Sequence, residues 1–304
     1  MQKFLLAVDE MRKLSSGFEL ADLFPSLSFL GGLTGLTSRL ERAHSCWDAI
    51  LNEIIEEHLI KSGEGKDMDE LIVDVLLRLR EDKELDMHLT MDNIKAVISD
   101  LFVAGTETTS TFMDWAMTEL IRHPHVMRKA QSEVRRYSNG GTGAQEWEIN
   151  KLPYLSCIMK ETFRLHPAAP LLVPRVGRET VDLFGYAVPA GSRVLINVGA
   201  IMRDPKYWDD PESFRPERFE GSAVDFKGAN FEYTPFGAGR RICPGMAFAI
   251  SNIEQWLAPL LCYFDWGLPD GRRAEELDVE ESFGGAVSRK HDLIVVATPY
   301  MPAM

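Results

Sequence analysis

The sequence predicts a mainly α-helical protein that carries a small β region. Apolar residues recur at helical spacing through most of the first two thirds of the chain. After about residue 170 this pattern gives way to short apolar runs separated by turn residues, which is typical of strands. A proline-rich meander from Asp204 to Pro216 shows neither period. No internal repeat or low-complexity linker divides the 304 residues, so we expect one domain over residues 1–304.

The helical segments come first along the chain. We expect helices over 36–60, 69–81, about 90–122, about 124–138 and about 153–166. The third of these is apolar nearly all round near Ile98 and Phe102, which predicts that it crosses the core. His123 and Pro124 end it, and Pro124 suits the first position of the next helix because the backbone N–H there has no partner within the helix.

The β region follows, and it is interrupted by the last helix. We expect strands over 171–175, 181–183, 186–188 and 193–197, with a turn at Ala190-Gly191. A helix is predicted from Cys243 to about Tyr263. Two further strands, near 284–288 and 292–298, are expected to close the fold.

The composition excludes several classes of function. A content of 45% hydrophobic and 26% charged residues suits a globular body with a sizeable core. The net charge of −13 makes nucleic acid an unsuitable partner. No run of 18 uninterrupted apolar residues marks a membrane span. The four cysteines, Cys46, Cys157, Cys243 and Cys262, have neither paired nor metal-type spacing, which indicates a reducing compartment. The seven histidines show no metal-ligand pairing either.

One cysteine lies in an unusual setting, the glycine-rich window Pro235–Gly245, directly before an apolar helix. An isolated cysteine is ordinarily a buried structural thiol. Here the glycines allow a positive φ and a close approach of the backbone. Backbone N–H groups and the positive end of the following helix would both favour the thiolate of Cys243 over the thiol. Arg241 is placed to pair with a carboxylate.

The same window identifies a family. Phe236, Gly239, Arg241, Cys243 and Gly245 follow the spacing Phe-x-x-Gly-x-Arg-x-Cys-x-Gly. This pattern resembles the haem-binding loop of the cytochromes P-450, the haem-thiolate monooxygenases. The resemblance implies the cytochrome P-450 fold, and haem b held by the residues of this pattern with Cys243 as the axial iron ligand. A thiolate in that position pushes electron density onto the iron and favours O–O cleavage.

A second motif is Glu161-Thr162-Phe163-Arg164, whose two charged residues share one face of a helix. Alone, Glu-x-x-Arg is most often a surface pair. Downstream, Phe214–Phe219 contains the order Pro-Glu-Arg-Phe. The resemblance implies that Glu161, Arg164 and Arg218 form a buried triad that fixes the meander and the cysteine loop.

A third motif, Ala104–Thr109, lies midway along the longest predicted helix. Glycine and threonine are poor helix formers, so the residues alone predict a kink. The segment resembles the oxygen-activation motif of the family, in which Gly105 leaves room for O2. By the same resemblance Thr108 and Glu107 are the catalytic residues that deliver protons.

The resemblance also suggests how the remaining pocket is built. It places Arg175 beside Arg241 as a ligand of the haem carboxylates. The segments that would line the substrate pocket are apolar, which implies a hydrophobic substrate. Taken alone, each of these residues would be interpreted as part of the hydrophobic core. These pocket residues are Ile98, Leu101, Phe102, Ala104, Ala169, Leu171, Leu172, Val173, Gly285 and Ala286.

The implied activity is insertion of one atom of O2 into a small lipophilic substrate, such as a terpenoid, alkaloid or phenolic metabolite. Electrons would come from NADPH through NADPH-cytochrome P-450 reductase, at the cytosolic face of the endoplasmic reticulum membrane. A basic helix face would meet that reductase or simply be solvated; it carries Arg128, Lys129, Arg135 and Arg136. Family members are longer, so we expect the membrane anchor, the first β region and the early helices to be missing here.

Two alternatives stay open at the level of sequence. A haem-thiolate isomerase or dehydratase would act on hydroperoxides without O2 or a reductase, but the intact Glu107-Thr108 pair argues against it. A catalytically incomplete haem-binding fragment, from a truncated gene model, is favoured by the abrupt start at Met1. Residues 1–10 read as the middle of an amphipathic helix.

Overall fold

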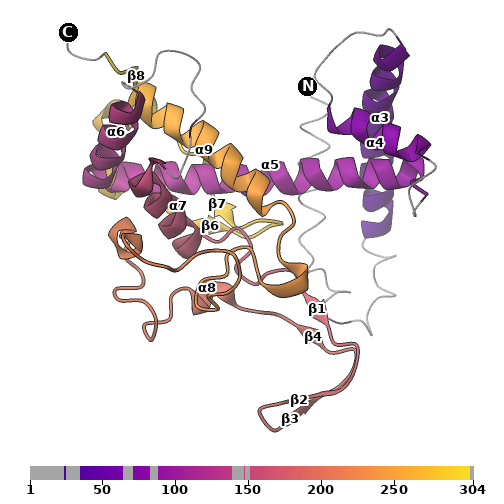
Figure 1. Cartoon of the computed structure of the whole chain (residues 1–304). Helices are drawn as coiled ribbons and strands as arrows, with labels where there is room; N and C mark the ends of the chain where they lie inside the picture. The colour runs from indigo at the N-terminus through magenta and orange to yellow at the C-terminus, as the bar shows by residue number, and fades with distance from the viewer. Residues whose placement is uncertain are drawn as a thin grey trace. The chain divides into compact units, whose positions relative to one another are not determined.

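The computed structural model describes residues 24, 35–63, 71–82, 88–138, 147 and 151–301. The expected helix over residues 1–10 lies outside these ranges. The chain divides into two compact units, Met1–Glu107 and Thr108–Met304. The predicted helices are present in them (Figure 1), as α3 (Leu36–Gly63), α4 (Ile72–Glu81), α5 (Met91–Arg122), α6 (Pro124–Ser138), α7 (Pro153–Leu165) and α9 (Met246–Tyr263).

The first unit is built from α3, α4 and the first part of α5. Apolar side chains at helical spacing pack together here, because each helix presents one stripe of them. The cluster contains Trp47, Leu51, Ile55, Val73, Leu77, Ile94 and Ile98. Polar contacts border it, since the Trp47 indole donates to Ser99 Oγ at 2.7 Å and Lys95 Nζ lies 2.7 Å from Asp48.

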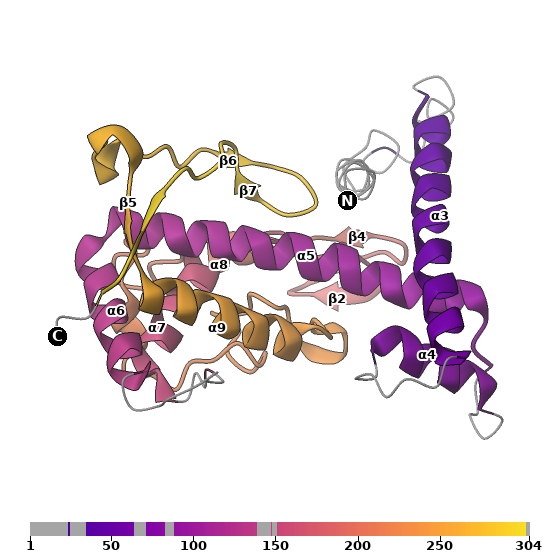
Figure 2. The same ribbon diagram turned by 90° about the horizontal axis from the view of Figure 1, so that it is seen from above.

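The core of the second unit is formed by the last part of α5 with α6, α7 and α9. Helices α6 and α9 lie side by side in both views (Figures 1 and 2), and α7 contacts α6. Leu120, Val126, Leu155, Ile158 and Leu257 are fully buried where these helices meet. As predicted, Pro124 occupies the first turn of α6, so α5 ends at Arg122.

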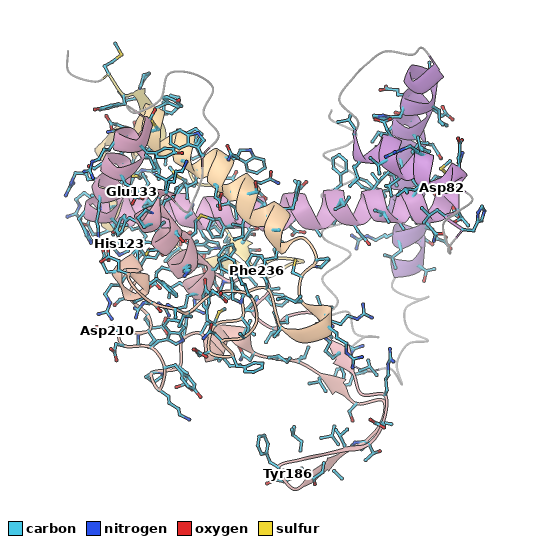
Figure 3. All side chains as sticks on the ribbon, viewed as in Figure 1. Asp82, His123, Glu133, Tyr186, Asp210 and Phe236 are labelled. Atoms are coloured by element: carbon cyan, nitrogen blue, oxygen red, sulfur yellow. The ribbon has the colours of Figure 1, made fainter. Side chains whose placement is uncertain are left out.

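The β region consists of short antiparallel pairs. The pairs are β1 (Arg175–Val176) with β4 (Arg193–Val194), β2 (Val181–Leu183) with β3 (Tyr186–Val188), β5 (Phe264–Gly267) with β8 (Val296–Pro299), and β6 (Glu281–Ser282) with β7 (Ser288–Arg289). Phe184 and Gly185 join β2 to β3 with φ of 54° and 84°. Two positive φ values give the turn the twist that a two-residue hairpin requires. Tyr186 lies beside this turn, at the exposed end of the hairpin (Figure 3).

Several predicted boundaries in this region were wrong. Leu171 and Leu172 form a turn instead of a strand, with Leu172 at φ 51° and its N–H donating to Ala169 O at 2.9 Å. The strand predicted at 284–288 is shifted, because β6 and β7 flank a turn there. Strand β5 was not predicted, since its apolar residues continue those of α9 with no turn residue between them. The short helix α8 (Val198–Ile201), at the end of the strand expected over 193–197, was also missed.

Short 3₁₀-helices complete the second unit: η3 (Pro216–Phe219), η4 (Gly239–Arg241), η5 (Pro269–Gly271) and η6 (Ala274–Glu276). The first of these ends the meander and the second lies in the cysteine loop. No helix within the described ranges combines the length and the apolar character that crossing a bilayer requires.

Candidate functional site

The cysteine loop has a backbone that its glycines make possible. Gly237 and Gly239 adopt φ of 74° and 73°, values that L-residues rarely take. The Cys243 N–H donates to Phe236 O at 3.0 Å, which closes the loop around these glycines. Cys243 is half-buried and carries a free thiol, and α9 begins three residues later at Met246. The sulfur is therefore held near the positive end of a helix.

Contacts that the sequence did not predict hold this loop against the core. Phe236 (Figure 3) packs on Phe163 of α7 and on Phe226, with ring centroids 4.9 and 5.7 Å apart. Gly228, at φ 84°, lies beneath the loop, where a Cβ would come within 3.2 Å of Ala238 Cα. A contact that close cannot be made without moving the backbone of the loop.

Replacing Gly228 by alanine is therefore expected to displace the loop. Gly221 is a matched control, because its φ of 68° imposes similar strain but nothing lies within 4 Å of its Cβ position. Both variants should lose about 1 kcal/mol to left-handed backbone strain. Gly228→Ala should lose about 1–2 kcal/mol more, and its Cys243 thiol should be alkylated faster in peptides followed by mass spectrometry. Equal effects of the two substitutions would contradict the packing described here.

Two arginines, Arg175 and Arg241, meet at the cysteine loop. Arg175, in β1, donates from Nη2 to the backbone oxygen of Arg241 at 3.3 Å. In the part of the chain that the structure describes, neither guanidinium forms a salt bridge with a carboxylate. Such a pair suits a ligand with two carboxylates of its own.

The donor set fits haem. It combines a thiol that can become a thiolate with two arginines available for propionates. The glycines of the pattern also fit: a Cβ on Gly239 would meet nothing within 4 Å, and one on Gly245 would lie 3.9 Å from Cys243 Sγ. Glycine at position 245 thus keeps the space beside the sulfur free of a side chain.

The charged residues of the second sequence motif and of the Pro-Glu-Arg-Phe segment lie together in the core. Glu161 and Arg164 are both fully buried and joined by two hydrogen bonds of 2.8 and 2.9 Å. Arg218, from η3, reaches the same carboxylate with Nε 2.9 Å from Oε1. The backbone N–H of Arg215 donates to that oxygen at 2.8 Å. The carboxylate of Glu161 therefore binds donors from α7 and from the end of the meander.

The two guanidinium groups also hold the meander through its backbone. Arg164 Nη1 donates at 2.9 and 2.7 Å, and Arg218 Nη1 at 2.8 Å, to main-chain oxygens. The Nη2 atoms of Arg164 and Arg218 also donate to backbone oxygens of the meander, at 3.1 to 3.3 Å. The accepting carbonyls belong to Met202, Asp209, Asp210, Pro211 and Ser213.

The predicted oxygen motif lies on an uninterrupted stretch of α5, so Gly105 and its neighbours do not break the helix. Thr108 is exposed and Glu107 is half-buried. Thr109 is 2% exposed, and within the described residues its hydroxyl has no hydrogen-bond partner. The proton-delivering role of Thr108 and Glu107 stays a prediction.

The predicted pocket residues fall into two groups. In the first unit, Ile98 belongs to the buried cluster of α3, α4 and α5, whereas Leu101, Phe102 and Ala104 are exposed. In the second unit, the Val287 N–H donates to Ala168 O at 2.8 Å, so the segments that follow α7 and β6 lie together. Among these residues Ala286 is buried, Val173 and Gly285 are exposed, and the half-buried ones are Ala169, Leu171 and Leu172.

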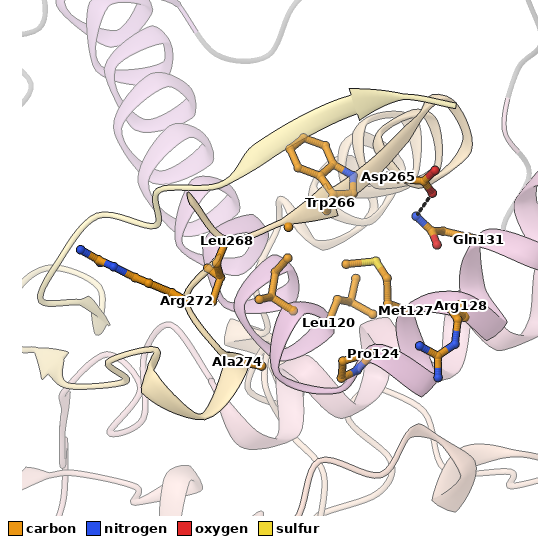
Figure 4. A pocket seen from close by; sticks show the side chains of 12 residues that line it. Leu120, Pro124, Met127, Arg128, Gln131, Asp265, Trp266, Leu268, Arg272 and Ala274 are labelled. Atoms are coloured by element: carbon orange, nitrogen blue, oxygen red, sulfur yellow. Dashed lines mark hydrogen bonds between the residues drawn. The ribbon is translucent and has the colours of Figure 1, made fainter. Parts of the chain in front are cut away.

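A cavity of about 270 Å³ lies elsewhere in the second unit, between the end of α5, α6 and β5 (Figure 4). Gln131 Nε2 donates to Asp265 Oδ1 at its edge. It includes none of the residues predicted for the haem site, the triad, proton delivery or the substrate pocket. Its lining is Leu120, Ile121, Pro124, Met127, Arg128, Gln131, Asp265, Trp266, Gly267, Leu268, Arg272 and Ala274.

The basic face of α6 is partly used within the molecule. Lys129 lies 3.0 Å from Glu217 and 2.7 Å from Glu220. Arg135 pairs with Asp265 at 2.8 Å and covers the ring of Tyr300. Of the four basic residues singled out in the sequence, Arg128 and Arg136 are exposed to solvent without such a pair among the described residues.

A buried charge network in α5 was missed by sequence reasoning, because its members are far apart in the chain. Glu119 is buried and lies 3.0 Å from Arg122, 3.2 Å from His123 and 2.9 Å from His166. Burial acts to raise the pKa of Glu119, but the hydrogen bonds from His123 and His166 outweigh it and lower the pKa to about 2. Glu119 is therefore ionised at neutral pH.

The His123 hydrogen bond to Glu119 raises the pKa of His123 above its ordinary value of 6.5. A raised pKa stabilises the fold fully below pH 6.5, and the stabilisation is lost as pH rises through the folded-state pKa. The unfolding free energy of wild type minus that of His123→Gln, from urea titrations, should therefore be largest near pH 5.5 and shrink toward pH 8.5. In a Glu119→Gln background the same difference should vary less with pH, because the carboxylate is removed and only the backbone oxygen of residue 119 still accepts from His123. A pH-independent difference in wild type would contradict this pairing.

Comparison with known proteins agrees with this geometry. The family model described as Cytochrome P450 matches residues 1–294. The chain is 48% identical to premnaspirodiene oxygenase of Hyoscyamus muticus, over 99% of this chain and 61% of that protein. It is 50% identical to desmethyl-deoxy-podophyllotoxin synthase of Sinopodophyllum hexandrum, over 97% of this chain and 59% of that protein.

The solved structure of a zebrafish cytochrome P450 with abiraterone is also similar. It has a TM-score of 0.76 and 26% identity, and the match covers 99% of this chain and 66% of that one. This chain thus spans about 60% of the length of its curated relatives. The family match along nearly all of its residues shows that the chain belongs to the cytochrome P450 family.

Proposed function

We propose that this chain carries the haem-binding and catalytic residues of a monooxygenase. The observation that carries the proposal is the free Cys243 thiol in its glycine loop, beside two arginines without carboxylate partners among the described residues. Cys243 would hold the iron of haem b, and Arg175 and Arg241 would bind its propionates. When bound, the haem supplies an iron centre that activates O2. One oxygen atom would enter the substrate and the other would leave as water.

The residues of the chain would then have separate tasks. Thr108 and Glu107 would hold and pass the protons that oxygen reduction consumes. The Glu161, Arg164 and Arg218 triad would fix the meander that leads into the cysteine loop. The segments around Ala169 and Ala286 would form apolar walls for the substrate.

The substrate is proposed to be a small lipophilic plant metabolite, a terpenoid, alkaloid or phenolic. The names of the relatives support this class, since they include oxygenases or synthases for premnaspirodiene, desmethyl-deoxy-podophyllotoxin and melianol. NADPH-cytochrome P-450 reductase is the proposed electron donor, at the cytosolic face of the endoplasmic reticulum membrane. Arg128 and Arg136, exposed and without a carboxylate partner among the described residues, would meet it.

The first test is the reduced, carbon-monoxide-bound difference spectrum of the chain expressed with haem supplied. A strongly red-shifted Soret band is expected, because a thiolate ligand to the iron produces it. Incubation with reductase, NADPH, ¹⁸O2 and premnaspirodiene then tests for transfer of a single labelled oxygen atom. A haem spectrum without thiolate character would refute the assignment of Cys243.

A further inference from the structure

The end of α5 carries a buried group of side chains that the proposed chemistry does not use. Glu119 accepts a hydrogen bond from His166, which is the first residue after α7. A carboxylate can only accept, so Nε2 of His166 carries the proton in this contact. Buried carboxylates require such partners. Glu119 thereby joins the end of α7 to α5.

The ring of His166 in turn lies flat against Trp115. Their centroids are 3.9 Å apart and the rings are inclined by 6°. Trp115 is 1% exposed and lies one helical turn before Glu119 on the same face of α5. Glu119 and Trp115 therefore hold His166 from two sides.

The same two turns of α5 hold the segment between β6 and β7. The indole N–H of Trp115 donates to Val287 O at 3.3 Å. The neighbouring Asp114 lies 3.6 Å from the buried Arg289. Val287 then donates to Ala168 O at 2.8 Å, two residues after His166. The contacts close a ring that runs from α5 through residues 166–168 and 287–289 back to α5.

We propose that Trp115 is a positioning residue for the substrate pocket. Through His166 and Val287 it holds the start of segment 167–173 and the end of segment 284–287, both of which line the pocket under the proposed function. The inference rests on that function only for the identity of the pocket. The ring of contacts itself is independent of haem.

The test compares Trp115→Phe with a matched control, Trp266→Phe, in the full chain. Phenylalanine keeps an aromatic ring against His166 but removes the donor to Val287. Trp266 also donates to a backbone oxygen, that of Leu260 at 2.8 Å, outside the ring of contacts. Amide hydrogen exchange of both variants is followed by mass spectrometry.

Trp115→Phe should speed exchange about fivefold in peptides covering 167–173 and 284–289, since loss of one buried hydrogen bond opens them locally. Trp266→Phe should leave both segments unchanged. If Trp115→Phe fails to fold, Asp114→Asn should speed exchange in 284–289. If exchange in these segments is unchanged, or if it rises equally along the whole chain, the proposal is overturned.

A second readout separates positioning from simple structural support. In the haem-loaded chain, imidazole and clotrimazole are titrated by their absorbance changes. Imidazole is too small to sense the pocket walls, whereas clotrimazole must fit against them. Trp115→Phe should weaken clotrimazole binding at least about fivefold relative to imidazole. An unchanged ratio would overturn the role in the pocket. Altered exchange in a chain that never gives a thiolate spectrum would support the ring of contacts and refute only the proposed function.

Discussion

The Arg164→Ala variant is expected to lose roughly 3–5 kcal/mol of its free energy of unfolding. The substitution leaves Glu161 buried with one ionic partner fewer, and it deprives the carbonyls of Met202 and Pro211 of their donor. Because a domain is stable by only about 5–15 kcal/mol, this loss removes a large share of the stability of the fold. Urea unfolding followed by tryptophan fluorescence measures the loss, and Trp208, 5.3 Å from the guanidinium, reports on the meander directly.

Arg215→Ala is the control for that result. Arg215 lies in the same meander, but its side chain is exposed and 3.5 Å from the exposed Asp210. Surface ion pairs contribute about 0–1 kcal/mol, so this variant should remain close to wild type. The free energy of unfolding of Arg164→Lys should lie between those of the two alanine variants. Lysine keeps the charge but lacks the planar guanidinium that donates two hydrogen bonds to Glu161. Similar losses in Arg164→Ala and Arg215→Ala would contradict the buried network.

Cys243→Ser is expected to abolish the thiolate difference spectrum while it leaves the fold intact. Serine is close to cysteine in shape, but a hydroxyl does not supply the anionic sulfur that the iron requires. Cys243 is only half-buried, so the free energy of unfolding should change by less than about 1 kcal/mol.

Cys262→Ser should behave in the opposite way. Cys262 is buried near the end of α9, among apolar side chains. A serine hydroxyl there costs about 1–3 kcal/mol when it lacks a partner, yet the thiolate spectrum should persist. A thiolate signal that survives in Cys243→Ser, or disappears from folded Cys262→Ser, would show that the ligand was wrongly assigned.

The helices could be predicted from the sequence because their signals are local and repeated. Pro124 and the apolar period specify α6 without any knowledge of its neighbours. The strands could not be predicted in the same way. Two residues such as those of β1 carry too little pattern, and β5 exists only because β8 pairs with it from about thirty residues further along the chain.

The same division applies to the candidate site. Cys243 and the Glu161 triad could be predicted because residue spacing resembles a family pattern within short windows. Trp115 was not predicted, because it acts through contacts with distant parts of the chain. Trp115 and Val287, for example, are 172 residues apart. Nothing in either local sequence indicates that the two meet.

The meander is held by arginines that bind its main-chain oxygens. Every amino acid supplies such an oxygen, so the course of this segment does not depend on which side chains it displays. We therefore expect residues 204–212 to accept wide variation in their exposed side chains, whether by drift or by design, provided that Arg164 and Arg218 are kept. This surface is a place where new recognition properties can be introduced without rebuilding the fold.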